Sequence, residues 1–263
     1  MATDLNPSGY DAFAPFYDAF TAGSDYENWT RRVLPAAERH GLTGDALVDL
    51  ACGTGKSFLP LMRRGFRVTA CDSSRAMLAV AAAKAPDAEL VHCDLRELPL
   101  LGSFDLATCF DDSLNYLLDE TELLASFHGI AANLAAHGLL VFDLNTLRAY
   151  RTTFARDSIT EHDGTLFAWR GESAPDMAPG GTASARIDIF ASAGPELYGR
   201  VTSRHEQRHF PREDVLEALR TAGLECAALY GALDDGRLVE PADESAQLKV
   251  LYIARHAKGG GGE

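Results

Sequence analysis

The segment between Asp45 and Leu144 alternates short apolar runs with helical stretches, and this alternation constrains the fold more than any other feature of the chain. It predicts five strands, at residues 46–50, 67–71, 89–93, 104–110 and 138–144. Helices are predicted between them, up to about residue 64, over 73–85, and from about 120 to 136. Strands and helices that alternate through short loops are typical of a parallel sheet with helices on both faces. The predicted fold class is therefore α/β, with a doubly wound, mostly parallel sheet.

The alternation stops at about Thr146, where a different pattern begins. Residues 146–210 contain stretches at 165–170, 185–190 and 197–209 that predict an antiparallel β insertion after strand five. A helix over 213–221 and strands over 224–233 and 247–254 follow, which brings the main sheet to seven strands. We divide the chain into an N-terminal helical cover (1–44), a core (45–145), the insertion (146–210), a segment completing the core sheet (211–255) and a flexible tail (256–263).

The N-terminal cover is rich in aromatic residues. Four of them are spaced by three and four and so share one face of a predicted helix: Phe13, Phe16, Tyr17 and Phe20. Pro15 is placed in the first turn of that helix. The phenylalanines are interpreted as core, whereas aromatics with a polar group are better candidates for a lid over a ligand: Tyr17, Tyr26 and Trp29.

Charge excludes one broad class of partner. The chain has 24 basic and 38 acidic residues, for a formal charge of −14, which argues against nucleic acid because phosphate binding needs a basic surface. The longest apolar run, residues 76–83, is too short to span a bilayer, so no membrane association is predicted. No secretory signal is recognised, and we expect a cytoplasmic location.

A glycine-containing turn, Asp49-Leu50-Ala51-Cys52-Gly53-Thr54-Gly55, follows the first predicted strand. Glycines at positions 53 and 55 allow a sharp turn and a close approach of backbone to ligand. The turn departs from the G-x-G-x-x-G fingerprint of dinucleotide sites, and Asp49 would repel a pyrophosphate. An acidic side chain suits the ammonium of an amino acid instead. The turn therefore favours S-adenosylmethionine, and a nicotinamide cofactor is the weaker alternative.

Acidic residues also end the next three strands. Asp72 ends the second strand, 23 residues after Asp49, where a carboxylate accepts hydrogen bonds from ribose hydroxyls in doubly wound folds. Asp94 and Leu95 end the third strand and suit an adenine amine and its ring. The fourth strand ends in Phe110-Asp111-Asp112. All of these positions lie at the carboxyl edge of the sheet, where open α/β sheets bind ligands.

With these motifs the chain resembles the class I S-adenosylmethionine-dependent methyltransferases. Their first motif, acidic-x-G-x-G-x-G, is matched by Asp49, Gly53 and Gly55, with Ala51 in place of the first glycine. The resemblance covers about residues 10–255. It is strongest to small-molecule enzymes such as the N,N-dimethyltransferases of nucleotide-linked amino sugars. These share the aromatic N-terminal segment, a D-S-L-N-Y-L stretch at 112–117 and the β insertion.

The resemblance implies S-adenosylmethionine as cofactor and a set of residues around it. Gly53 and Gly55 would pass under the methionine moiety, Asp72 would hold the ribose, and Tyr17 and Trp29 would close over the methionine carboxylate. The full set of implied cofactor-binding residues is Tyr17, Trp29, Asp49, Ala51, Cys52, Gly53, Gly55, Asp72, Ser73, Met77, Asp94, Leu95, Phe110 and Asp111.

Methyl transfer from a sulfonium mainly needs alignment of donor and acceptor, and a base helps by taking a proton. The candidate catalytic residues are Asp111, His205 and His209, and Asp112 is a further candidate base. Asp112 is equally interpreted as a helix cap. For the two histidines, a solvated face of an edge strand is the structural alternative, although positions 205 and 209 point to the same side of a strand.

The predicted function is methyl transfer to a small-molecule acceptor in secondary metabolism, with an amine of a sugar or amino acid as first choice. An oxygen or carbon acceptor and a non-catalytic cofactor-binding module are the alternatives. The insertion, the expected acceptor lid, has eight arginines, eight acids and no lysine. An anionic acceptor gripped by Arg200 or Arg204 is therefore also considered. A homodimer is left open.

Four of the five cysteines fall near strand ends: Cys52, Cys71, Cys93 and Cys109. In the strand order 3-2-1-4 that is usual for this fold, the outer two would lie roughly 14 Å apart, because neighbouring strands are about 4.8 Å apart. A zinc ion needs all its sulfur ligands at about 2.3 Å. No metal site is predicted, and the cysteines are interpreted as small buried apolar residues.

Overall fold

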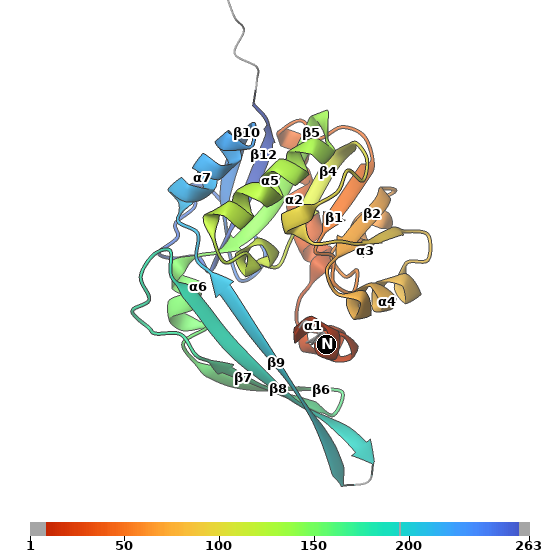
Figure 1. Cartoon of the computed structure of the whole chain (residues 1–263), viewed down its shortest axis with the longest axis vertical. Helices are drawn as coiled ribbons and strands as arrows, with labels where there is room; N and C mark the ends of the chain where they lie inside the picture. Colours follow the sequence, from red (N-terminus) through yellow and green to blue (C-terminus); the bar gives the residue numbers. More distant parts are fainter. Residues whose placement is uncertain (1–8, 195, 258–263) are drawn as a thin grey trace, which may run out of the picture.

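The computed structural model describes residues 9–194 and 196–257, which form two β-sheets (Figure 1). The core sheet has the order β11-β10-β12-β5-β4-β1-β2-β3. Its strands are β1 (Ala46–Leu50), β2 (Arg67–Asp72), β3 (Glu89–His92), β4 (Phe104–Cys109), β5 (Leu134–Asn145), β10 (Leu224–Ala232), β11 (Leu238–Val239) and β12 (Lys249–His256). Strands β1 to β5 run parallel, and β12 is antiparallel to both β5 and β10. The predicted mostly parallel sheet is confirmed, with the two-residue β11 as an additional edge strand.

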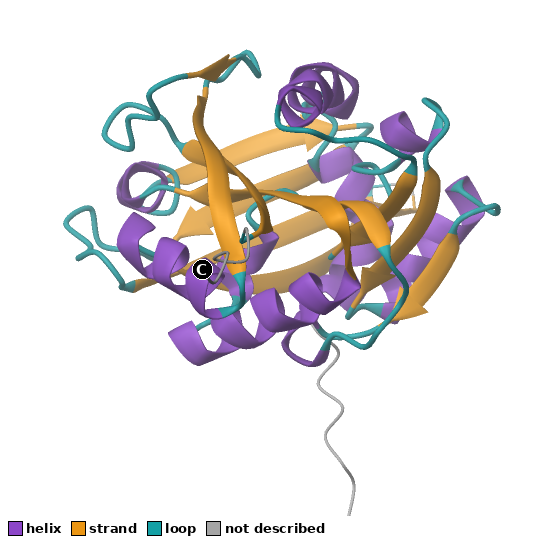
Figure 2. Ribbon diagram, turned by 90° about the horizontal axis from the view of Figure 1, so that it is seen from above, coloured by secondary structure: helices purple, strands orange, loops and turns teal. Residues whose placement is uncertain are grey.

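Helices cover both faces of this sheet, as Figure 2 shows. They are α1 (Gly9–Phe20), α2 (Tyr26–Arg39), α3 (Leu59–Met62), α4 (Arg75–Lys84), α5 (Glu120–Asn133), α6 (Leu147–Thr152) and α7 (Arg212–Thr221), with 3₁₀ turns η1 (Leu95–Glu97) and η2 (Ser113–Tyr116). Residues of α5 and α7, such as Phe127 and Leu219, pack in one apolar cluster with Phe142 of β5. Residues of α2 and α4, such as Val33 and Leu78, pack in a second cluster. Burial on both faces explains why the strands are nearly continuous apolar runs.

The insertion forms a separate antiparallel sheet of order β6-β7-β8-β9, which confirms the predicted change of sheet type. Its strands are β6 (Asp157–His162), β7 (Thr165–Gly171), β8 (Thr182–Gly194) and β9 (Leu197–Arg208). The sequence pattern had not predicted β6 or the short α6. In Figure 1 the β8–β9 hairpin extends away from the core sheet, and α1 lies beside it. Phe13 of α1 packs with Ile187 and Ile189 of β8. Asp18 of α1 accepts a hydrogen bond from Thr54 after β1, so the N-terminal helix links the insertion to the core.

Three predicted element bounds are wrong. The helix after the glycine turn is reduced to α3, because the turns before it place Ala51, Gly53 and Gly55 at positive φ. The helix predicted to end at residue 136 ends at Asn133, whose side chain bonds backbone groups of the loop before β4, and β5 begins at once. Pro15 lies inside α1 rather than in its first turn, since α1 begins at Gly9.

Residues 1–8 of the predicted cover and 258–263 of the predicted tail lie outside the described residues, and His256 belongs to β12. Within the part of the chain that the structure describes, no helix is both long and apolar enough to cross a membrane.

Candidate active site

A cavity of about 200 Å³ lies at the carboxyl ends of β1, β2 and β3, under α1. Nine of the residues predicted to bind the cofactor line it: Tyr17, Ala51, Gly53, Asp72, Ser73, Met77, Asp94, Leu95 and Asp111. The other residues that line it are Tyr10, Cys93, Arg96, Ser113, Tyr116 and Leu117. The strand-end residues therefore converge on one cavity, as expected for the carboxyl edge of a parallel sheet. We call it the donor cavity.

Asp72 is held in a fixed orientation at the end of β2. Its two carboxylate oxygens accept hydrogen bonds from the backbone N–H groups of Gly53 and Ser74, at 2.8 Å each. Burial raises the pKa of this carboxyl, and the two backbone donors oppose that shift. Gly53 has φ of +53°, and a Cβ there would point toward the ring of Tyr17, 3.8 Å away. The turn and the carboxylate thus form one rigid wall.

Five predicted cofactor-binding residues do not line the donor cavity: Trp29, Asp49, Cys52, Gly55 and Phe110. Asp49 is buried below the turn and accepts hydrogen bonds from the hydroxyls of Ser57 and Thr108. Burial raises the pKa of Asp49 to about 7. The structure therefore places Asp49 as a support for the turn, away from the position expected for an ammonium contact.

Glycine is needed at position 55 for packing inside the protein, and not for contact with a ligand. A Cβ at this position would lie 2.9 Å from the ring of Phe58. Phe110 is likewise buried in the core and contacts the edge of Trp29. Of the two glycines, only Gly53 lines the donor cavity.

Arg96 was missed by the sequence analysis. It donates to the carboxylate of Asp94 at 2.6 and 2.9 Å and to Glu122 at 3.1 Å. Asp94 also caps η1 by accepting from the backbone N–H of Arg96. The Arg96 guanidinium lowers the pKa of Asp94 and keeps it ionised. The pairing orients the Asp94 carboxylate at the rim of the donor cavity.

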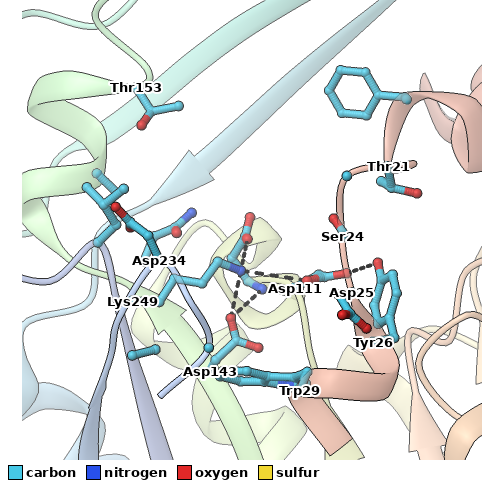
Figure 3. A pocket seen from close by; sticks show the side chains of 18 of the residues that line it. Thr21, Ser24, Asp25, Tyr26, Trp29, Asp111, Asp143, Thr153, Asp234 and Lys249 are labelled. Atoms are coloured by element: carbon cyan, nitrogen blue, oxygen red, sulfur yellow. Dashed lines mark hydrogen bonds and ion pairs between the residues drawn. The ribbon is translucent and has the colours of Figure 1, made fainter. Parts of the chain in front are cut away.

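A second and larger cavity, of about 630 Å³, adjoins the first between the core sheet, the N-terminal helices and the insertion (Figure 3). Four residues line both cavities: Tyr10, Tyr17, Asp111 and Tyr116. Trp29, a predicted lid residue, lines only the larger one. Because the two spaces share this wall, a group bound in one can face a group bound in the other. We call the larger space the acceptor cavity.

Lys249, at the start of β12, lies among three carboxylates in the acceptor cavity. Its Nζ is 2.6 Å from Asp112, 2.8 Å from Asp143 and 3.9 Å from Asp111. Burial works against the charged form of Lys249, but these carboxylates outweigh it and raise the pKa of the ammonium. Figure 3 shows Asp111, Asp143 and Lys249 converging from different elements.

Asp111 and Asp112 both have positive φ, +57° and +51°, in the loop between β4 and η2. This conformation is costly for residues with a Cβ and is often found at functional sites. Asp111 accepts a hydrogen bond from the hydroxyl of Tyr26. The interpretation of Asp112 as a side-chain cap is wrong, since its carboxylate binds Gln207 and Lys249 instead.

The two predicted catalytic histidines have different surroundings. Both are buried, with 3% of each residue exposed, so the solvated-strand alternative is wrong. His205 lines the acceptor cavity, with Nδ1 3.0 Å from the hydroxyl of Tyr116 and Nε2 3.0 Å from that of Ser203. His209 lines neither cavity; it accepts a hydrogen bond from the backbone N–H of Gly180. Burial lowers the pKa of each imidazole to about 4.

The arginines considered for an anionic acceptor are bound elsewhere. Arg200 donates to the buried carboxylate of Asp188 at 2.7 Å, and Arg204 lies 3.4 Å from Glu172. Neither lines the acceptor cavity, and no other arginine is among the described residues that line it. The even-numbered residues that carry these charges alternate with those of β9 that line the cavity, so they point away from it.

Sequence reasoning missed Tyr10 and Tyr116 of the shared wall and Asp143 and Lys249 of the acceptor cavity. Tyr116 occurs in the D-S-L-N-Y-L stretch, which drew attention only as a point of resemblance. Asp143 and Lys249 face each other across β5 and β12, where Asp143 pairs with Leu251. The signal available for them was a charged residue in an otherwise apolar strand, as at Asp143 in L-L-V-F-D-L-N.

Three of the four strand-end cysteines are buried as the sequence indicated, and Cys93, which lines the donor cavity, is the exception. Cys52, Cys71 and Cys109 are buried and Cys93 is half-buried beside the donor cavity, and all are free thiols. The place of the three buried cysteines in the packed sheet matches the interpretation as small apolar residues.

Comparisons with known proteins agree with this geometry. Residues 47–138 match a family model described as a methyltransferase domain. The chain is 29% identical to the putative methyltransferase YqeM of Bacillus subtilis, over 91% of this chain and 94% of that protein. It is 28% identical to a dTDP-3-amino-3,6-dideoxy-alpha-D-glucopyranose N,N-dimethyltransferase of Streptomyces fradiae, over 80% and 81% of the two chains.

Among solved structures, an S-adenosylmethionine-dependent methyltransferase from Clostridium acetobutylicum superimposes with a TM-score of 0.80. The sequence identity is 25%, with 95% of this chain and 99% of that chain covered. The doubly wound fold, with a cavity at the carboxyl edge of its sheet, is that of a transferase that binds a nucleoside cofactor. The chain is a class I S-adenosylmethionine-dependent methyltransferase.

The donor cavity fits this cofactor in the chemistry of its walls. Asp72 presents a half-buried carboxylate for hydroxyl donors, while Met77, Leu95 and Leu117 give the apolar surface that a purine ring needs. No described arginine or lysine other than Arg96 lines the cavity, and Arg96 is already paired with carboxylates. These walls suit a nucleoside without phosphates, which is the distinction between S-adenosylmethionine and a dinucleotide.

Proposed function

We propose that this enzyme transfers methyl groups from S-adenosylmethionine to the amine nitrogen of a small molecule bound in the acceptor cavity. The observation that best supports this proposal is the wall shared by the two cavities, which is formed by Tyr10, Tyr17, Asp111 and Tyr116. A methyl donor in the smaller cavity would face an acceptor in the larger one across these residues. The volume of about 630 Å³ is in the usual range for small-molecule sites.

The bound cofactor supplies an activated methyl group: the nitrogen lone pair forms the N–C bond as the C–S bond breaks, and its electron pair stays on sulfur. The protein has to orient the neutral amine and receive the proton that the new ammonium loses. Well-oriented reactions of this kind gain roughly 7–11 kcal/mol from alignment alone. The aromatic side chains of Tyr17, Tyr26 and Trp29 narrow the space for that alignment.

We assign Asp111 to the amine. It lines both cavities, and its orientation is fixed by the Tyr26 hydroxyl. A carboxylate at this place attracts an ammonium and stabilises the positive charge that develops on nitrogen. Its distance of 3.9 Å from Lys249 leaves it less neutralised than Asp112, at 2.6 Å.

His205 is assigned to proton removal through Tyr116. With its pKa near 4, the imidazole is neutral at physiological pH, so it takes a proton only transiently and passes it on to solvent. Tyr10 donates to Tyr116 at 2.7 Å, and Tyr116 lies 3.0 Å from His205, so a hydrogen-bonded chain leads from the shared wall to the imidazole. His209 takes no part in this series of hydrogen bonds, and we do not retain it as a catalytic candidate.

The similarity to the amino-sugar N,N-dimethyltransferase supports nitrogen as the acceptor atom. Asp111 at the shared wall supports the same choice, since a carboxylate stabilises the positive charge of a methylated nitrogen and disfavours an alkoxide or carbanion. Secondary metabolism is the setting in which we place the reaction.

The test is label transfer from S-adenosylmethionine carrying a CD₃ group to a panel of small amines, alcohols and phenols, followed by mass spectrometry and NMR. The proposal expects CD₃ on nitrogen and one S-adenosylhomocysteine per methyl group. Label found on oxygen or carbon alone would contradict it. Asp111→Asn is expected to reduce turnover at least tenfold with donor affinity changed less than threefold, and the exposed Asp87→Asn is the control.

A further inference from the structure

The acceptor cavity is strongly acidic. Six aspartates line it, Asp25, Asp111, Asp112, Asp143, Asp234 and Asp235, against a single lysine, Lys249, among the described residues. That lysine is already bound to Asp112 and Asp143. Asp235 is partly neutralised by its ion pair with Arg237, at 2.6 Å. The balance of charge along the lining is therefore clearly negative.

One of these carboxylates has unused hydrogen-bonding capacity. Asp143 is 1% exposed and binds Lys249 through Oδ2, while its Oδ1 has no hydrogen-bond partner within the described residues. A buried carboxylate oxygen without a donor is costly, and a ligand N–H would satisfy it. This observation points to a donor group on the acceptor, independently of the count of charges.

The acidic groups have a definite arrangement. In Figure 3, Asp25 lies with Ser24 and Tyr26 on one side of the cavity, Asp234 lies on the other, and Asp111 and Asp143 lie between them. Asp25 and Asp234 are exposed, whereas Asp143 is buried. A ligand that enters from solvent therefore passes two exposed carboxylates before it reaches the inner ones.

The wall beside α1 and the insertion sheet is apolar. Phe13 and Phe20 of α1, Phe154 after α6, Trp169 of β7 and Ile187 of β8 line this side. Phe13, Phe154 and Ile187 are nearly fully buried around the cavity, so the wall is a packed surface. It offers a hydrophobic surface for the body of a ligand whose charged end lies among the aspartates.

We infer that the acceptor is an amine that is cationic in solution and gives up one proton before its nitrogen attacks, with an apolar or aromatic body and no phosphate or carboxylate group. This inference rests on the proposed function and narrows its substrate class. A nucleoside diphosphate sugar, the kind of substrate in the printed name of the Streptomyces fradiae relative, would bring at least two negative charges into this cavity. Lys249, the one lining cation, is already engaged, and the arginines expected to grip an anion lie elsewhere.

The experiment uses matched pairs of amines that differ by one anionic group. The pairs are 2-phenylethylamine and phenylalanine, tyramine and tyrosine, tryptamine and tryptophan, and glucosamine and glucosamine 6-phosphate. We expect kcat/KM at least tenfold higher for the member without the anionic group, with the aromatic amines above glucosamine. Equal or higher kcat/KM for the anionic members would overturn the inference and leave N-methylation intact. If S-adenosylhomocysteine binds but no amine is methylated, the proposed function itself fails.

A charge reversal at the cavity mouth gives a second readout. Asp234→Lys is expected to raise KM for the cationic amines about tenfold and to lower the inhibition constant of the anionic members. Asp87→Lys, on the exposed loop after α4, is the matched control and should change neither. The effect of Asp234→Lys should shrink as salt rises, because exposed charges are screened. Equal effects of the two variants would overturn the inference.

Discussion

The hydroxyl of Tyr116 lies 3.0 Å from Nδ1 of His205, and this contact joins the loop after β4 to the edge strand of the insertion. Tyr10 of α1 completes the contact by donating to Tyr116. Three segments far apart in the sequence therefore meet at the wall between the two cavities. The insertion thus supplies a residue of the site as well as a cover for it.

Removing this contact should slow the reaction without weakening donor binding. Tyr116→Phe and His205→Asn are each expected to lower kcat about tenfold, and the double variant should lose little more because both act through one hydrogen-bonded chain. Steady-state kinetics and calorimetry with S-adenosylhomocysteine measure the two effects.

His209→Asn is the control for burial, because His209 has a similar pKa near 4 but lines neither cavity. It should lower stability and leave the kcat of the folded enzyme unchanged. In wild type, kcat should show no inflection from His205 between pH 6 and 8, since the imidazole is already neutral there. A His209→Asn variant as slow as His205→Asn would refute the assigned roles.

Donor binding should depend on Asp72 more than on Asp94. Asp72 is half-buried and anchored by two backbone N–H groups, whereas Asp94 is paired with Arg96. Asp72→Ala should raise the Kd of S-adenosylhomocysteine about 10- to 100-fold, because a charge-assisted hydrogen bond is worth about 1.5–3 kcal/mol. Asp94→Ala should raise it less than tenfold. Calorimetry on both variants checks the ranking, and wild-type affinity in Asp72→Ala would remove the ribose assignment.

Asp49 should make stability depend on pH. Its pKa of about 7 in the folded protein is above the value near 3.9 expected in the unfolded chain, so its contribution is complete in acid and is lost as pH rises through 7. Through Asp49, the wild-type protein should lose roughly 2–3 kcal/mol of unfolding free energy between pH 5 and 8. The Asp49→Asn variant should not show this loss. Urea denaturation of both proteins at the two pH values measures this. Identical pH dependence of the two proteins would show that Asp49 is not protonated in the fold.

Substitutions of Ala51 test the effect of having alanine at the position of the motif's first glycine. Ala51 has φ of +52° at the position of the first glycine in the motif acidic-x-G-x-G-x-G, and an L-residue there costs roughly 1–2 kcal/mol. Ala51→Gly removes that strain but adds unfolded-state entropy, so unfolding free energy should stay within about 1 kcal/mol of wild type. Ala51→Val should destabilise by about 2 kcal/mol or more, because β-branched residues tolerate positive φ poorly. Thermal denaturation checks both, and a Val variant as stable as wild type would contradict the strained conformation.

The sequence was a good guide to the core sheet and the donor cavity because both depend on local signals. Apolar runs located the strands, and the residues that end them, such as Asp72 and Asp94, meet at one edge whatever the side-chain packing. The glycine turn was recognised, but its detail was not. Gly55 packs against the ring of Phe58, three residues later in the sequence, and the glycine pattern alone does not show whether a glycine faces a ligand or such a ring.

The acceptor cavity was less accessible to sequence reasoning because its contacts are long-range. Lys249 and Asp112 are 137 residues apart in the chain, and His205 and Tyr116 are 89 apart. Nothing in the local pattern of β9 distinguishes a buried histidine from a solvated one. The arginine count of the insertion indicated an anionic acceptor, yet Arg200 is bound to Asp188 outside the cavity.

The most direct test of the two-cavity account is a crystal structure with S-adenosylhomocysteine and the best amine of the panel. We expect the ribose hydroxyls on Asp72, the adenine beside Met77 and Leu95, and the sulfur facing the acceptor cavity between Tyr17 and Asp111. The amine nitrogen should lie on the far side of that wall, in line with the sulfur. A sulfur directed away from the acceptor cavity, or an amine bound outside it, would contradict the account.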